Sequence, residues 1–346
     1  MFLKIKKRID RELKEYSLGI EKTYHLNSLS PLLFKSIKEY ILREGKRVRP
    51  ILFCIGYLGF SKKPSAGLFR SAISLELLHD FMLIHDDIID KSDIRRGKPA
   101  MHVMLNKKIP KNKGIKFNGQ DMAIVTGDVI YAMALDAFLS IKEEPKRKEL
   151  ALKKLILAAL YTGSGEFIEL LLGAKQIDKV NKNEVYKIYD YKTANYTFAS
   201  PLAMGATLAG ADKKQILKLL QYGMCLGRAF QIKDDIIGTF AKSSEIGKSN
   251  LTDLAEAKKT ILLWHAYNNC SGGEKKIMKK ILSMGCAGRA ELKQIRSIIL
   301  KSKSLRYAKD EIKSLIDRSR RILVSTKIKH HYRKALEDFS EKILKV

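Results

Sequence analysis

The chain has 346 residues, 45% hydrophobic and 30% charged, a composition that excludes a disordered protein. Its 66 Lys and Arg against 37 Asp and Glu give a net charge of +29, which indicates a polyanionic partner: nucleic acid, an anionic membrane surface or a phosphorylated substrate. The four cysteines have no zinc-ligand spacing, so we expect reduced thiols and a cytoplasmic location. No run of about 18 apolar residues and no secretory signal is evident, so we expect no membrane span.

Apolar residues recur at three- and four-residue spacing along most of the chain, and alternating strand patterns are nearly absent. The predicted helical stretches, in chain order, are 71–90, 122–141, 149–172, 183–210, 214–240 and 290–317. Breaker residues predict joints between helices, including Gly163–Gly165 and Gly238. A stretch at 106–120 with five lysines and no acid predicts a mobile basic loop. We therefore expect an all-α fold of ten or more helices, with 1–346 as a single domain.

The first motif with clear chemistry is His85-Asp86-Asp87-Ile88-Ile89-Asp90, at the end of an apolar helix. Asp86 and Asp90 lie one helical turn apart on one face, and Asp87 is turned about 100° away, which we expect to place it toward the rim. Carboxylates so close together repel one another unless a cation joins them. Oxygen ligands of high charge favour Mg²⁺; the alternative is a solvated acidic helix end.

A second acidic helix end follows about 150 residues later, in Phe230-Gln231-Ile232-Lys233-Asp234-Asp235. Two matching acidic ends on core helices can face each other across a bundle cavity. Such a pair predicts a polynuclear Mg²⁺ site that holds a diphosphate.

Clusters of positive charge also lie at the ends of predicted elements. They are Gly45–Pro50 (GKRVRP), Arg95–Pro99 (RRGKP), Gly247-Lys248 and Lys258–Thr260. Arg offers a planar fork to phosphate oxygens and Lys a point charge. Arg95 and Arg96 follow Asp90 so closely that we expect them to reach the phosphate that the metals hold.

Taken in order, GKRVRP, HDDIIDKSDIRRGKP, TGD, KTA, FQIKDD and KKT strongly resemble the motifs of the trans-isoprenyl diphosphate synthases, or polyprenyl synthetases. The resemblance covers residues 44 to 260. It implies an all-α bundle around a central cavity and a homodimer. It also implies a prenyltransferase that joins isopentenyl diphosphate to an allylic diphosphate with three Mg²⁺ in each active site. The chain departs from the pattern at Gly238, where many members carry a third aspartate, and at Gly165-Glu166, where the family often has Gly-Gln.

The resemblance also implies roles for the matching residues. The metal ligands would be Asp86, Asp87, Asp90 and Asp234, with Asp235 as a supporting carboxylate. Binding of the allylic diphosphate would fall to Arg95, Lys192 and Lys248, with Lys258 as a further substrate-binding group. The pocket for isopentenyl diphosphate would be formed by Lys46, Arg49, His79 and Arg96. The groups near the reacting carbons would be Thr193, Gln231 and the ring of Phe230. The residues counted as catalytic are Asp86, Asp90, Asp234, Lys192, Thr193 and Gln231.

Product length is expected to depend on the helix that ends in the first motif. Phe81 lies five residues before Asp86, about 7–8 Å deeper, and Met82 four before it. A lone aromatic at the fifth upstream position resembles the archaeal-type geranylgeranyl diphosphate synthases and implies a C20 product. The alternative products are farnesyl and geranylfarnesyl diphosphate. The alternative role for Phe81 is that of an ordinary core ring with no effect on product length.

Other functional hypotheses have less support in the sequence than a prenyltransferase. A class I terpene cyclase would need a different metal motif in place of FQIKDD and would not need the isopentenyl diphosphate cations. A nucleic-acid-binding protein is motivated only by the charge, and no binding motif is recognisable. We therefore expect no nucleic-acid partner. Because most of the excess charge lies outside the motifs, we also consider peripheral contact with an anionic membrane.

Overall fold

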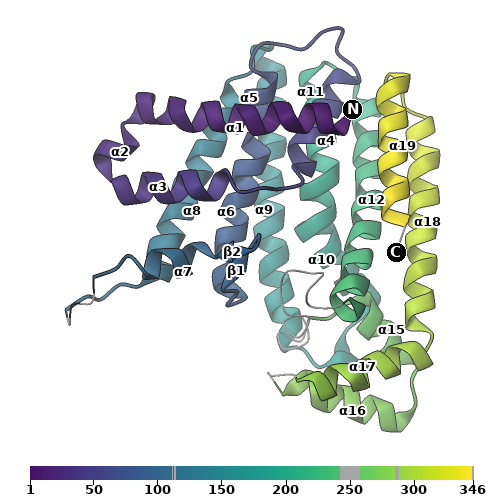
Figure 1. The fold of residues 1–346 in the computed structure, drawn as a ribbon. Coiled ribbons are helices and arrows are strands. Elements are labelled where there is room, and N and C mark those ends of the chain that lie inside the picture. Colours follow the sequence, from purple (N-terminus) through teal and green to yellow (C-terminus); the bar gives the residue numbers. More distant parts are fainter. Residues whose placement is uncertain (111, 113, 242–257, 285–287, 345–346) are drawn as a thin grey trace. The chain divides into compact units, whose positions relative to one another are not determined.

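The computed structural model describes residues 1–110, 112, 114–241, 258–284 and 288–344. They form an all-α fold of more than ten helices (Figure 1). The only sheet within these residues pairs two two-residue strands, β1 (Ile94–Arg95) and β2 (Lys98–Pro99). The predicted fold class is thus confirmed. The chain divides into two compact units, which are described separately below, and the expectation of a single domain stays a prediction.

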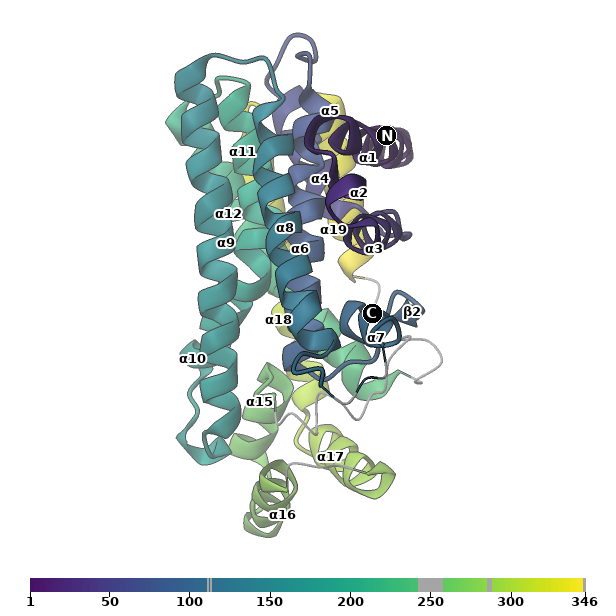
Figure 2. The same ribbon diagram turned by 90° about the vertical axis from the view of Figure 1, so that its left-hand side faces the viewer.

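Unit 1 comprises residues 1–152 and 204–210. Its helices are α1 (Phe2–Tyr24), α2 (Leu26–Leu29), α3 (Pro31–Ile41), α4 (Val48–Leu58), α5 (Leu68–Ala72), α6 (Ser74–Ile89), α7 (Met101–Asn106), α8 (Gly119–Leu139), and parts of α9 (Pro145–Ala174) and α11 (Ser200–Leu208). Helices α6 and α8 pack side by side (Figure 2). Helix α8 begins at a capping box, in which Asn118 accepts a hydrogen bond from the Asp121 amide and Asp121 accepts one from the Asn118 amide.

Unit 2 comprises residues 153–203 and 211–346. Besides the rest of α9 and α11 it contains η1 (Ile177–Lys179), α10 (Lys182–Ile188), η2 (Tyr189–Ala199), α12 (Lys213–Phe240), α15 (Ile261–Asn269), α16 (Gly272–Ser283), α17 (Arg289–Lys301), α18 (Ser304–Val324) and α19 (His330–Leu344). Helix α12 packs against η2 and α18. A Cβ on Gly227 of α12 would lie 2.4 Å from the Ala194 Cα of η2. The glycine therefore lets the two helices approach closely enough to bring their polar side chains together.

The predicted helix at 183–210 is continuous but not uniform. Between α10 and α11, the 11 residues of η2 form a π-helix. π-helical turns are rare and often occur at functional sites. The motif Lys192-Thr193 lies in this segment.

Several predicted joints are wrong. Gly163 and Gly165 lie inside α9, and Gly238 lies inside α12. A Cβ on Gly165 would be 2.8 Å from the backbone nitrogen of Lys192, so this glycine serves the close approach of η2 to α9 rather than a turn. The stretch 290–317 is instead interrupted at Lys303, which adopts a left-handed conformation with φ 58°.

Two described helices, α8 and α9, are long and apolar enough to cross a membrane by length and composition. The expectation of no membrane span, which was based on the lack of an uninterrupted apolar run, stays a prediction. Single polar residues such as Asp128 interrupt α8 without removing its overall hydropathy. Core helices of proteins that do not enter membranes meet the same criteria of length and composition. Parts of both α8 and α9 are buried in the fold.

Candidate active site

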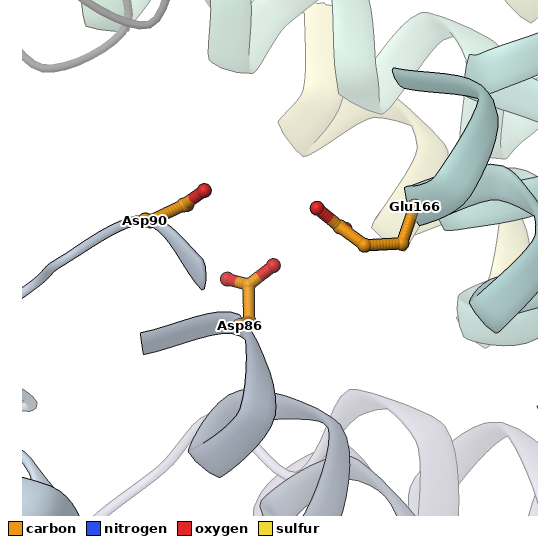
Figure 3. Close-up of side chains that lie close together, drawn as sticks. All are labelled: Asp86, Asp90 and Glu166. Atoms are coloured by element: carbon orange, nitrogen blue, oxygen red, sulfur yellow. The ribbon is translucent and has the colours of Figure 1, made fainter. Parts of the chain in front are cut away.

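The acidic end of α6 brings two carboxylates together in unit 1. Oxygen atoms of Asp86 and Asp90 lie within 4.8 Å of each other, as the one-turn spacing predicts. In Figure 3 the side chains of Asp86 and Asp90 leave the end of α6 toward the same side; Glu166, which is also drawn, belongs to unit 2 and is described with that unit. Both aspartates are partly exposed. Two accessible carboxylates at this separation form a donor set suited to Mg²⁺.

Asp87 differs from the prediction. Its side chain is completely buried instead of facing the rim, and it accepts hydrogen bonds from Nε and Nη2 of Arg95. Burial raises the pKa of Asp87 to about 6, although Arg95 opposes the shift. The prediction is wrong about the direction because the 100° step turns Asp87 toward the packed side of α6. In this structure Asp87 orients Arg95, whose Nη2 also lies 3.6 Å from Asp86.

Arg96 is held by two buried acids of α6. Its Nη2 lies 3.1 Å from Glu76 Oε1 and 3.2 Å from Asp80 Oδ1. The backbone of Arg96 is left-handed, with φ 53°, a conformation that non-glycine residues adopt rarely. Burial raises the pKa of Asp80, while Arg96 works in the opposite direction. The β1–β2 turn thus carries one arginine beside the acidic end of α6 and a second one deeper along the same helix.

The Gly45–Pro50 segment converges on the same glutamate. Arg47 is buried, has φ 52°, and donates to Glu76 Oε1 at 2.6 Å and to Asp10 Oδ1 at 2.9 Å. Burial would lower the pKa of Arg47, but the two carboxylates raise it above its ordinary value. Glu76 therefore ties two cation-bearing loops to α6. Sequence analysis missed Glu76 and Asp80, for which acidic residues four apart inside an apolar helix were the available signal, and it counted Arg47 only as one cation of the Gly45–Pro50 cluster.

The remaining groups predicted for isopentenyl diphosphate lie in unit 1 as well. Lys46 is exposed, and Arg49 is partly buried in the first turn of α4. Burial, reinforced by Arg49, Arg96, Arg95 and Arg47, lowers the pKa of His79 well below its ordinary value. The imidazole is thus neutral, and the positive charge of this region resides on its arginines and lysines.

Phe81 lies on α6 beside α8. Its ring contacts His85, with ring centroids 4.7 Å apart, and Tyr131, with centroids 5.2 Å apart. A Cβ on Gly127, in the TGD motif, would lie 2.6 Å from His85 Nε2 and 3.4 Å from the Phe81 ring. Phe81 is therefore fixed in a row of rings, whereas the neighbouring Met82 is partly exposed and conformationally adaptable.

The second acidic end, on α12 in unit 2, contains one exposed and one buried carboxylate. Asp234 is exposed, whereas Asp235 is buried and accepts hydrogen bonds from Gln231 Nε2 at 3.0 Å and from the Tyr189 hydroxyl. Gln231 Oε1 in turn accepts from Thr193 at 2.6 Å. This chain of hydrogen bonds connects η2 with α12 and leaves Asp234 as the accessible carboxylate.

Tyr189 is a further residue that sequence analysis missed. Its hydroxyl donates to Asp235 and accepts the Ile261 amide at 2.8 Å. Burial and the neighbouring Asp235 raise the pKa of Tyr189 well above its ordinary value, so the hydroxyl keeps its proton. Because Ile261 directly follows Lys258–Thr260, Tyr189 joins this basic segment to the acidic end of α12.

Lys192 lies between two glutamates of α9. Its Nζ contacts Glu166 and lies 2.5 Å from Glu169 Oε2. Glu166 lies at a position where the trans-isoprenyl diphosphate synthases, which the motifs resemble, often have glutamine. A carboxylate at this position gives Lys192 a second negatively charged partner. The ammonium is thereby positioned by α9 and partly neutralised.

The other predicted residues of unit 2 have distinct environments. Phe230 packs against Phe198, with ring centroids 5.3 Å apart. Lys258 is partly exposed, whereas Lys259 is buried, donates to the Gly173 carbonyl at 2.9 Å, and has its pKa lowered to about 8 by burial. Lys248 lies outside the described residues.

An all-α fold with two acidic helix ends, one of them beside Arg95, is the arrangement expected of an enzyme that acts on prenyl diphosphates. The sequence profile of the polyprenyl synthetase family matches residues 30–299. The chain is 31% identical over 305 residues to the short chain isoprenyl diphosphate synthase of Methanocaldococcus jannaschii, a match that covers 88% of this chain and 84% of the relative. It is 32% identical over 284 residues to the geranylgeranyl diphosphate synthase of Sulfolobus acidocaldarius, covering 80% and 79%.

A solved structure has the same fold. The geranylgeranyl pyrophosphate synthase of Corynebacterium glutamicum, complexed with isoprenyl diphosphate and magnesium, superposes with a TM-score of 0.89, covers 99% of this chain and 98% of that one, and is 23% identical. The chain belongs to the polyprenyl synthetase family. It is accordingly a prenyltransferase of the isoprenyl diphosphate synthase type.

Proposed function

We propose that the chain is a Mg²⁺-dependent synthase that condenses isopentenyl diphosphate head-to-tail with the allylic diphosphates of five, ten and fifteen carbons (DMAPP, GPP and FPP). The product is a short-chain all-trans prenyl diphosphate, and pyrophosphate is released. The observation that carries the proposal is the pair of carboxylates of Asp86 and Asp90, within 4.8 Å of each other, with Arg95 beside Asp86. The short-chain relatives over most of the chain support this choice.

The donor set fits Mg²⁺ because its accessible members are carboxylates. Asp86, Asp90 and Asp234 would hold three ions, with Asp87 and Asp235 as supporting carboxylates. When bound, the ions would neutralise the charge that develops on the departing pyrophosphate. Arg95 and Lys192 would bind the same diphosphate; within unit 1 Arg95 contacts Asp87, and within unit 2 Lys192 contacts Glu166 and Glu169.

The second substrate needs a pocket without metal. We assign isopentenyl diphosphate to Lys46, Arg49 and Arg96, with the neutral His79 as a hydrogen-bonding group. The pocket would hold the double bond close to the allylic cation, which is the positioning contribution to the rate. Thr193, Gln231 and Phe230 would line the region of the reacting carbons, and the final proton would leave to pyrophosphate, so that no histidine base is required.

We propose geranylgeranyl diphosphate, C20, as the main product, for use in isoprenoid and membrane-lipid biosynthesis. Its support is the fixed ring of Phe81, which would end the path of the growing tail. Farnesyl and geranylfarnesyl diphosphate are the alternative products. Chromatography of products formed with each primer offered separately distinguishes the three.

We also propose that the enzyme acts as a cytoplasmic homodimer. The apolar faces of α8 and α9 support a dimer, because they expose large side chains such as Val125, Leu160, Phe167 and Leu171. Exposed large apolar side chains that recur on one helix face, as Leu160, Phe167 and Leu171 do on α9, commonly mark a protein interface. Light scattering during size-exclusion chromatography tests the dimer; a single monomeric peak at micromolar concentration would contradict it.

The activity is tested by incubating the protein with isopentenyl diphosphate and each allylic primer, with and without Mg²⁺. Asp86→Asn should lower kcat by at least about a hundredfold, because it removes charge that acts on the developing pyrophosphate. Asp338→Asn, an exposed aspartate on α19, is the matched control and should retain full activity. Absence of any metal-dependent condensation would refute the proposal, and cyclic hydrocarbon products would favour a terpene cyclase.

A further inference from the structure

Helix α1 has one face buried in unit 1 and one that points away from it. Apolar side chains of its inner face, including Ile9, Leu13 and Ile20, are fully or almost fully buried. At 100° per residue, the opposite side presents six residues within an arc of about 80°, one of which is the half-buried Glu21 at the edge of the arc. The other five are Leu3, Lys7, Arg11, Lys14 and Leu18, all of them exposed. We call them the outer face of α1.

The acidic residues of α1 have partners that take up their charge or their hydrogen-bonding capacity. Asp10 pairs with Lys6 at 2.7 Å and with Arg47, and Glu12 pairs with Arg70 at 2.6 Å. Glu21 accepts the Asn27 amide at 2.7 Å. Within the helix, which is described over its whole length, the exposed charges are Glu15 and the cations Lys4, Lys7, Arg8, Arg11, Lys14 and Lys22. Internal ion pairs thus leave α1 with a strongly basic exterior.

We propose that the outer face of α1 docks the enzyme onto an anionic lipid surface. Basic side chains on an exposed helix are attracted to the negative potential of such a surface, and the attraction is screened by salt. Leu3 is 74% exposed and Leu18 is 48% exposed, at the two ends of the row of cations. Apolar side chains so placed can enter the acyl boundary while the cations between them contact the headgroups.

The composition of the outer face favours lipid over the other polyanions. It has no aromatic side chain on which a base could stack, whereas such side chains are typical of single-stranded nucleic acid sites. A second copy of the chain would oppose one basic row to another, which costs energy. Lipid also suits the enzyme on the proposed function, since a C20 product partitions into membranes. The membrane affinity of a C20 product rests on the proposed function, whereas the charge pattern of α1 does not.

Vesicle sedimentation tests the proposal directly. The full chain should sediment with phosphatidylcholine vesicles containing about 30 mol% phosphatidylglycerol, should not sediment with pure phosphatidylcholine, and should be released by about 0.5 M salt. The variant Lys7→Glu/Arg11→Glu/Lys14→Glu should lose at least about tenfold in vesicle affinity. A milder variant, Lys7→Gln/Lys14→Gln, should lose part of it and covers the case in which the triple variant fails to fold.

The matched control reverses the same number of charges elsewhere. Arg306, Lys309 and Lys313 are exposed along one side of α18, where Asp310 is interspersed among them. Arg306→Glu/Lys309→Glu/Lys313→Glu changes the net charge equally and should keep vesicle affinity within about twofold. Equal losses in both triple variants would overturn the proposal, because they would show that net charge rather than the outer face of α1 is responsible.

Three further results would also overturn it. They are binding to neutral vesicles as strong as to anionic ones, unchanged binding by the α1 triple variant, and retention by single-stranded RNA without sedimentation by vesicles. Condensation activity measured with soluble primers keeps the two proposals apart. A protein that condenses substrates but ignores anionic vesicles refutes docking alone, and one that binds vesicles but fails to condense refutes the proposed function alone.

Discussion

Substitution of Glu76 offers the sharpest test of how Arg47 and Arg96 are positioned. The perturbation is Glu76→Gln, which keeps the size of a buried side chain and removes its charge. Its Oε1 accepts from Arg47 at 2.6 Å and lies 3.1 Å from Arg96. An amide in its place can still accept hydrogen bonds, but it no longer compensates two arginines, of which Arg47 is almost inaccessible to water.

The magnitude follows from the partners that remain. Removing one partner of a buried ion pair costs about 3–5 kcal/mol when the other charge is left alone. Here Arg47 keeps Asp10 at 2.9 Å, and Arg96 keeps Asp80 at 3.2 Å. We therefore expect the free energy of unfolding to fall by about 2 kcal/mol. Because the loosened Arg96 belongs to the predicted isopentenyl diphosphate pocket, KM for that substrate should rise about tenfold, with a smaller change in kcat.

The assays are urea unfolding followed by circular dichroism and steady-state kinetics with isopentenyl diphosphate varied. Glu15→Gln is the matched control, because Glu15 is exposed and its ion pair with Arg11 is long, at 3.9 Å. This substitution should change the free energy of unfolding by less than about 0.5 kcal/mol. A change equally small for Glu76→Gln would refute the reasoning. It would show that Asp10 and Asp80 alone compensate the two arginines.

Three further predictions concern single side chains. Tyr189→Phe should lower the free energy of unfolding by about 1–3 kcal/mol and reduce kcat, because Asp235 and the Ile261 amide lose a shared partner; unchanged kcat would remove Tyr189 from the positioning of Asp235. Phe81→Ala should lengthen the products seen by chromatography, and an unchanged distribution would show that Phe81 does not end the tail path. The pKa of Lys259 is lowered to about 8 from 10.5, so between these values the unfolded chain binds the extra proton. Wild-type stability relative to Lys259→Met should therefore rise by about 2 kcal/mol from pH 8 to 10.5, and urea unfolding at several pH values that showed a fall would contradict the assigned shift.

The sequence was sufficient for features that depend on spacing along one helix. Asp86 and Asp90 are brought together because residues four apart share a helical face, and the all-α fold follows from the apolar period. Asp87 was placed wrongly, because the direction of the step is known from the period but the packed side of α6 is set by tertiary structure. Likewise Gly165 has the composition of a turn, and only the approach of Lys192 explains it as a contact inside α9.

Networks that join separate elements could not be predicted. Glu76 binds arginines from two separate loops, Arg47 and Arg96. Tyr189 is hydrogen-bonded both to Asp235 and to the first residue of α15. Each partner is distant along the chain, and neither residue belongs to a motif with metal or phosphate chemistry of its own. Their selection depends on which side chains are buried together, and this is a property of the folded chain.

The π-helical geometry of η2 limits how the length of the segment Tyr189–Ala199 can change. In a π-turn the backbone hydrogen bond joins residues five apart rather than four, so removal of one residue from Tyr189–Ala199 would shift the local spacing toward that of an α-helix. That shortened helix would turn the residues on one side of the deletion by about 100° relative to those on the other. A deletion between Tyr189 and Thr193 would then separate the hydroxyl bound to Asp235 from the one bound to Gln231. Insertions and deletions here should therefore be far less tolerated than substitutions, since the angular phase of the segment decides which side chains meet α12.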